Sequence, residues 1–183
     1  MRLLKLDDHG IPSLGEFSDD KFPRYAILSH TWREGEEVIF EALKDGTGKN
    51  KLGYNKIRFC GDQAWRDGLQ FFWVDTCCID KSNSTELQEA INSMFRWYHN
   101  AIRCYVYLAD VSTPTSDADD KSSQPPCESA FRKSRWFTRG WTLQELIAPA
   151  SVEFFSKEGI HLGDRKSLEQ HIHNTIGIPL KAL

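Results

Sequence analysis

The stretch from residue 131 to residue 149, FRKSRWFTRGWTLQELIAP, contains a single carboxylate, Glu145, inside a segment that reads as a helix ended by Pro149. The apolar side chains that this helix is expected to bury are Trp141, Leu143 and Leu146. Glu145 pairs with a neighbouring cation, Arg135 or Arg139, lies on the solvated side of its helix, or faces a cavity. In a cavity, a carboxylate can stabilise positive charge that develops on a bound substrate.

Other polar residues that can do chemistry follow three apolar runs, at residues 25–30, 71–76 and 103–108. These β-rich runs predict strands buried on both faces, as in a parallel sheet. Ligands bind such sheets at the carboxyl ends of the strands, where the strand order reverses. The residues at these ends are Ser29, His30, Thr31, Trp32, Arg33 and Glu34, then Asp75, Thr76, Cys78 and Asp80, and finally Asp110.

Each candidate also has a purely structural interpretation. Asp75 can cap the turn after its strand, and His30 can be a hydrogen-bonded core histidine. Cys77 is interpreted as a small core residue. Cys78 could instead pair with His30 as a nucleophile, although no local feature marks that thiol as activated.

Composition narrows the class of protein. The chain has 183 residues, of which 40% are hydrophobic and 12% aromatic, which predicts one globular domain over residues 1–183. A net charge of −3 gives no reason to expect nucleic acid as a partner. The first residues lack an uninterrupted apolar run for secretion, and no later run is long enough to span a membrane, so a cytoplasmic location is expected.

The five cysteines are odd in number and lack CxxC spacing, which predicts reduced thiols, mostly in the core, and no metal site. They are Cys60, Cys77, Cys78, Cys104 and Cys127.

Helices are predicted between the strands. Residues 53–68 have roughly helical spacing, and residues 84–101 form a stronger helix capped by Ser84 or Thr85. The apolar stripe of the second helix is interpreted as core; its members are Leu87, Ile91, Met94, Phe95 and Tyr98.

A fourth strand at residues 151–156 and a helix within residues 163–179 complete the pattern, with a mobile insertion loop at 112–129. Strands that alternate with helices predict an α/β fold, a three-layer sandwich around a mostly parallel sheet.

Four motifs, YAILSHTW, FFWVDTCCID, AIRCYVYLADV and SRWFTRGWTLQEL, resemble in order and spacing the fungal heterokaryon incompatibility (HET) domain over nearly the whole chain. That resemblance implies a cell-death effector in non-self recognition, often the N-terminal module of a larger receptor-like protein.

The last motif is also similar to the Ser-x-Trp-Cys-Leu-x-Glu-Leu pattern of Toll/interleukin-1 receptor (TIR) domains, and residues 86–108 resemble the helix and strand before it. This resemblance implies a flavodoxin-like sandwich. It also implies cleavage of NAD at the nicotinamide–ribose bond, with Glu145 as the catalytic glutamate. The chain departs from the pattern at Thr142, where TIR domains have cysteine, and in the long loop before the motif.

With NAD as substrate and no cofactor, Trp32 would stack on a flat ring, and Ser29 or His30 would hydrogen-bond ribose or phosphate. Arg33 would meet the diphosphate, and Asp75 would orient the site or a water molecule. The absence of a glycine-rich fingerprint argues against a Rossmann dehydrogenase. Further candidates for substrate binding are Cys78, Asp80 and Trp136.

A hydrolase of this kind is expected to need activation by self-association, because free activity would be toxic. The alternative is a self-associating interaction module without catalysis. Exposed aromatics such as Trp97 and Tyr98, with the basic segment FRKSR, would then supply its contacts.

Overall fold

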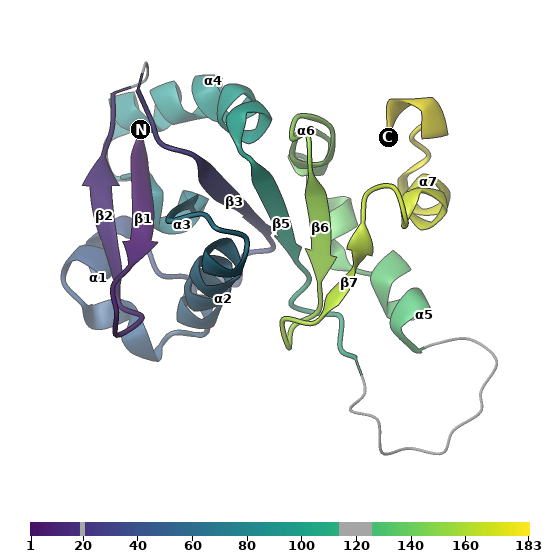
Figure 1. Ribbon diagram of the computed structural model, residues 1–183, viewed down its shortest axis with the longest axis horizontal. Helices are drawn as coiled ribbons and strands as arrows, with labels where there is room; N and C mark the ends of the chain where they lie inside the picture. The colour runs from purple at the N-terminus through teal and green to yellow at the C-terminus, as the bar shows by residue number, and fades with distance from the viewer. Residues whose placement is uncertain (19–20, 114–125) are drawn as a thin grey trace.

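A computed structural model describes residues 1–18, 21–113 and 126–183 (Figure 1). One sheet holds seven strands in the order β2-β1-β4-β3-β5-β6-β7. The strands are β1 (Arg2–Leu6), β2 (Pro12–Glu16), β3 (Tyr25–His30), β4 (Phe71–Trp73), β5 (Arg103–Tyr107), β6 (Val152–Phe155) and β7 (His161–Asp164).

The four central strands run parallel. β3 pairs in parallel with both β4 and β5, and β5 pairs in parallel with β6. The predicted parallel strands and the predicted fourth strand are therefore confirmed, as is the α/β sandwich. The order β4-β3-β5-β6 is flavodoxin-like, and the strand order reverses between β3 and β5.

The outer strands were not predicted, and all their pairings are antiparallel. β1 pairs with β2 and with β4, and β7 pairs with β6. The sheet is therefore parallel only in its centre. These outer strands are partly exposed, so they lack the continuous apolar runs that reveal β3 and β5.

Helices cover both faces of the sheet. They are α1 (Phe40–Lys44), α2 (Leu52–Arg66), α3 (Asp75–Cys78), α4 (Ser84–Asn100), α5 (Pro126–Arg132), α6 (Thr142–Ile147) and α7 (Glu169–Ile176), with 3-10 turns η1 (Thr47–Asn50), η2 (Arg135–Thr138) and η3 (Leu180–Ala182). None of the helices in the described ranges is long and apolar enough to cross a membrane.

Two neighbouring residues of β5 identify the two helical layers. The Tyr105 hydroxyl donates to Asp67 Oδ2, just after α2, at 2.5 Å. The Cys104 thiol points to the opposite face and donates to the carbonyl of Glu145 in α6 at 3.7 Å. Helix α2 therefore covers one face, in front of the sheet in Figure 1, and α6 covers the other with its neighbour α4.

Helix α4 differs from its prediction in two ways. Its N-cap is Asn83, whose side chain accepts from the backbone of Thr85 and Glu86, so neither Ser84 nor Thr85 caps it. Its apolar stripe is only partly core, because Phe95 is 55% exposed whereas Tyr98 is buried.

Residues 134–148, which the sequence predicts as a helix ended by Pro149, do not form one helix. Helix α5 ends at Arg132, η2 follows, and α6 begins only at Thr142 after the turn at Gly140. Trp141 and Leu143 are exposed rather than buried, whereas Leu146 is fully buried as predicted.

Of the predicted loop 112–129, residues 114–125 lie outside the described ranges, and residues 126–129 belong to α5. The four cysteines with described side chains, Cys60, Cys77, Cys78 and Cys104, are buried free thiols as predicted.

Candidate functional site

Glu145 is 2% exposed and is bound on both carboxylate oxygens. Arg139 donates to Oε2 and Oε1, at 2.8 Å each, and Ser29 from β3 donates to Oε2 at 2.5 Å. The indole N–H of buried Trp136 donates to Ser29 Oγ at 2.6 Å. The acid of the opening motif is therefore an ion-pair partner of Arg139, one of the two cations considered from the sequence.

The backbone around this pair is fixed locally. The Thr142 hydroxyl donates to the Trp136 carbonyl at 2.5 Å, which joins the start of α6 to η2. Burial on its own would lower the pKa of Arg139, but its pairing with Glu145 raises that pKa above the ordinary value. Arg139 therefore stays charged, and its guanidinium matches the carboxylate as a bidentate pair.

Glu145 also lines a pocket of about 500 Å³, so this acid is both an ion-pair partner and a residue that faces a cavity. The pocket is within the size range of small-molecule sites. Its polar and aromatic lining residues are Trp32, Asp75, Lys81, Arg139, Trp141 and Glu145, and its apolar wall is formed by Ile79, Leu87, Ile91 and Met94. Part of the α4 stripe that was interpreted as core therefore lines this pocket.

A second polar chain reaches the pocket through Asp75, the first residue of α3. Asp75 Oδ1 lies 2.9 Å from His30 Nε2, and Asp75 Oδ2 accepts from Trp32 Nε1 at 3.0 Å. Burial would raise the pKa of Asp75, but the hydrogen bond from His30 and the nearby charges of Lys81 and Arg139 lower it below the ordinary value. Asp75 is therefore a second anion of the pocket.

This series of polar contacts continues on the opposite face of the sheet, at Lys56 on α2. Lys56 Nζ donates to the Thr31 carbonyl at 2.8 Å and to Glu37 Oε1, and it lies 3.3 Å from His30 Nδ1. An ionised carboxylate only accepts, so Nε2 of His30 carries the proton directed at Asp75. Burial lowers the pKa of Lys56, and the carboxylate of Glu37 opposes that shift.

The structure brings part of the predicted site together. Ser29, His30, Trp32 and Asp75 lie with Glu145 at the carboxyl ends of β3 and β4. Trp136 is fully buried and reaches the site only through Ser29.

Ser29 and His30 contact residues of the pocket without lining it themselves, and three further candidates also do not line it. Arg33 is exposed, and its backbone N–H donates to Glu37 at 2.9 Å. Cys78 is buried, and its sulfur accepts from the backbone of Val74 at 3.4 Å. Asp80 accepts from the Ser82 hydroxyl at 2.6 Å.

Lys56, Glu37 and Lys81 were not anticipated from the sequence. Lys56 comes from α2, which only the tertiary fold places beside β3, whereas Glu37 and Lys81 follow the strand-end motifs by a few residues. His30 had been given a structural alternative, which the buried hydrogen bond to Asp75 supports without removing it from the site.

The strand order and the parallel centre of the sheet define a flavodoxin-like α/β fold, with a pocket of charged, aromatic and apolar residues at the ends of its parallel strands. Residues 25–128, more than half of the chain, match the family described as heterokaryon incompatibility protein (HET), and the chain belongs to that family.

The chain is 66% identical over 185 residues to the vegetative incompatibility protein HET-E-1 of Podospora anserina. The match covers 100% of this chain and 13% of that relative, so the chain spans a small part of the relative's length. No solved structure matches the chain.

Proposed function

We propose that this chain is a cell-death effector domain of heterokaryon incompatibility that hydrolyses NAD at the nicotinamide–ribose bond in the cytoplasm. The observation that carries the proposal is the position of Glu145, which lines one pocket together with Trp32 and Asp75. Membership of the HET family supports the biological role. The similarity of the Glu145 motif to TIR domains suggests the chemistry.

In this reaction the C–N bond between the ribose and the pyridinium ring breaks, and its electron pair goes to the ring nitrogen. Nicotinamide leaves as a neutral molecule, and positive charge develops on the ribose. A carboxylate beside the ribose stabilises that charge. Water then adds to the ribose carbon and releases one proton, which gives ADP-ribose. NAD is consumed as a substrate, and Glu145 supplies the carboxylate.

Arg139 lines the pocket and Arg33 does not, so Arg139 is the arginine that can meet the NAD diphosphate. A guanidinium that turns from Glu145 to a diphosphate exchanges one bidentate anion for another. The same movement frees Glu145 for the ribose. The observed Arg139–Glu145 ion pair is therefore consistent with a resting state of the site. Self-association would break the pair, and further domains of a longer protein would control that step.

The alternative, a self-associating module without catalysis, is favoured by a different observation. Trp97 and Tyr98, named from the sequence as possible contacts, are buried. Five other apolar side chains are exposed on the neighbouring helices α4 and α6 and at the turn before α6: Ile91, Phe95, Trp141, Leu143 and Ile147. Such side chains suit an interface, and an interface would also serve an enzyme that is activated by assembly.

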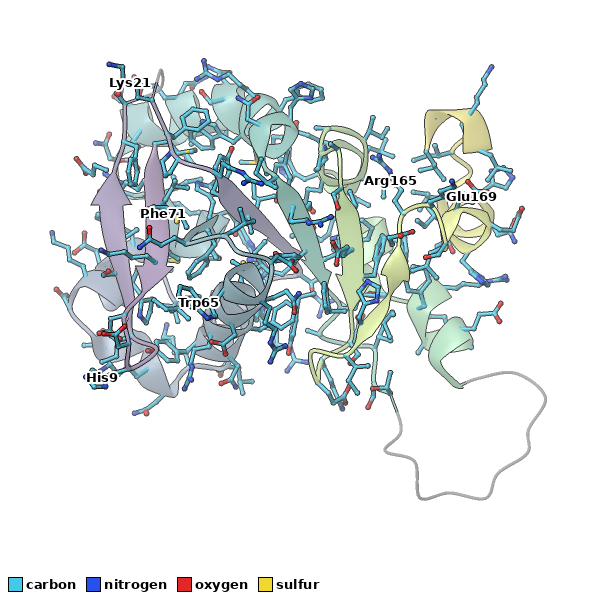
Figure 2. All side chains as sticks on the ribbon, viewed as in Figure 1. His9, Lys21, Trp65, Phe71, Arg165 and Glu169 are labelled. Carbon is cyan, nitrogen blue, oxygen red and sulfur yellow. The ribbon has the colours of Figure 1, made fainter. Side chains whose placement is uncertain are left out.

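Expression of the chain in yeast, with cellular NAD, nicotinamide and viability followed over time, tests the proposal. Glu145→Gln removes the charge and keeps the shape, so NAD loss and killing should fall together by orders of magnitude. Glu169→Gln is the matched control, because Glu169 is an exposed acid on α7 at the β7 side of the sheet (Figure 2). A folded Glu145→Gln variant that still kills cells would disprove hydrolysis and favour the interaction module.

A further inference from the structure

Trp32 is 48% exposed, yet its ring is held by polar contacts that begin on the far face of the sheet. Its indole N–H donates to Asp75, and Asp75 also accepts from His30. The other ring nitrogen of His30 in turn lies beside Lys56. A tryptophan that merely covers surface needs no such support. The arrangement holds a flat aromatic face in the pocket, directly beside an ionised carboxylate.

The face of Trp32 is already occupied by a cation. Lys81 Nζ lies 3.7 Å from the centre of the Trp32 ring, within the range of a close cation–π contact. Burial lowers the pKa of Lys81, while the charge of Asp75 favours its protonated form. Lys81 is partly buried and follows α3 in the link to α4, so its long side chain enters the pocket from a loop.

We propose that Trp32 and Asp75 form a subsite for a planar aromatic cation, and that Lys81 occupies this subsite until such a ligand displaces it. The electron-rich indole face selects a positive charge, and its flatness selects a ring over a compact ion. The Asp75 carboxylate adds charge attraction at the ring edge. Lys81 is then an internal competitor that lowers the apparent affinity of every ligand for the subsite.

The identity of the natural ligand rests on the proposed function, in which NAD is the substrate. The nicotinamide ring of NAD is a planar cation, whereas the ring of NADH is neutral. The subsite therefore predicts that the pocket selects the oxidised nucleotide through charge as well as shape. It also places the pyridinium ring at Trp32, on the side of the pocket formed by the ends of β3 and β4.

Calorimetric titration of the purified chain with two small probes tests the subsite without requiring any reaction. The cationic probe is 1-methylnicotinamide, and the neutral probe of nearly equal shape is nicotinamide. We expect the cation to bind about tenfold more tightly. Trp32→Leu should reduce this preference several-fold, and the charge of Asp75 accounts for what is left. Lys81→Met should tighten binding of the cation by about two- to tenfold, because it removes the internal competitor.

Two matched controls accompany these variants. Trp65→Leu alters another exposed tryptophan, on α2 and outside the pocket (Figure 2), and should leave both affinities unchanged. Lys44→Met removes a lysine that lies 5.8 Å from the Phe40 ring, and should likewise have no effect. Equal affinity for the two probes, no measurable binding of the cation, an undiminished preference in Trp32→Leu, or unchanged binding in Lys81→Met would each overturn the proposal.

The result can be separated from that of the proposed reaction. If the cation is preferred at Trp32 but cells expressing the chain keep their NAD, the subsite stands and hydrolysis fails. If NAD is consumed but the two probes bind equally, hydrolysis stands and the subsite is wrong.

Discussion

Replacing Arg139 by methionine should destabilise the fold because it leaves Glu145 buried without its counter-ion. Methionine keeps much of the apolar stem of arginine and removes the charge. Removing one partner of a buried pair costs about 3–5 kcal/mol. The Arg139 side chain is 21% exposed, and Glu145 keeps its hydrogen bond from Ser29. We therefore expect a loss somewhat below that range, about 2–3 kcal/mol in the free energy of unfolding.

The double variant Arg139→Met/Glu145→Leu should regain most of that loss, because an apolar pair carries no unpaired charge. Urea unfolding of the wild type, both single variants and the double variant gives the coupling free energy, provided that the slope against urea stays constant. Arg132→Met is the control. Its ion pair with Glu128 is exposed, and its loss should cost at most about 0.5 kcal/mol.

The reasoning would be refuted if Arg139→Met cost no more than Arg132→Met, or if the losses in the two single variants simply added in the double variant. Either result would mean that the carboxylate of Glu145 does not depend on Arg139 for its charge balance. The pair would then be no barrier to the use of Glu145 by a substrate.

Asn83→Ala should cost about 1 kcal/mol in unfolding by urea, because it removes the side chain that caps α4, whereas Ser84→Ala should cost clearly less; equal losses would contradict the assigned cap. Glu158 accepts from the Ser112 hydroxyl at 2.6 Å, and such hydrogen bonds outweigh burial and lower its pKa from 4.5 to about 2. Its contribution to stability is therefore complete above pH 4.5 and is lost as the pH falls towards about 2, so Glu158→Gln should make unfolding less pH-dependent in that window. Identical pH dependence in the wild type and Glu158→Gln would contradict this assignment.

The central strands could be predicted because burial on both faces leaves a direct trace in the sequence. β3 is buried at all six positions, and its residues 25–28 are uninterruptedly apolar. The edge strands leave no such trace. β7 has no buried residue and includes Gly163, so its pairing with β6 depends on tertiary contact rather than on local pattern.

The prediction that the whole apolar stripe of α4 is core was wrong, because helical periodicity reveals an apolar face but not what covers it. Ile91 and Phe95 continue the stripe of α4 but remain exposed, and Ile91 lines the pocket. The site was predicted where strand ends carry polar residues. The contact from a distant helix was not predicted. Lys56 on α2 contacts Thr31 and His30, which lie 25 and 26 residues away in the sequence, and only the folded sheet brings these residues together.

The last two residues of β3 point to opposite faces of the sheet, Ser29 to Glu145 and His30 to Lys56. A strand that is apolar on both faces has no alternation to fix its alignment with its neighbours. A slip by one residue would place an imidazole beside Trp136 and a hydroxyl beside Lys56, and both sets of polar partners would be left unmatched. Ser29 and His30 therefore make misaligned pairings of β3 less stable than the native pairing, although hydrophobicity alone would not distinguish them.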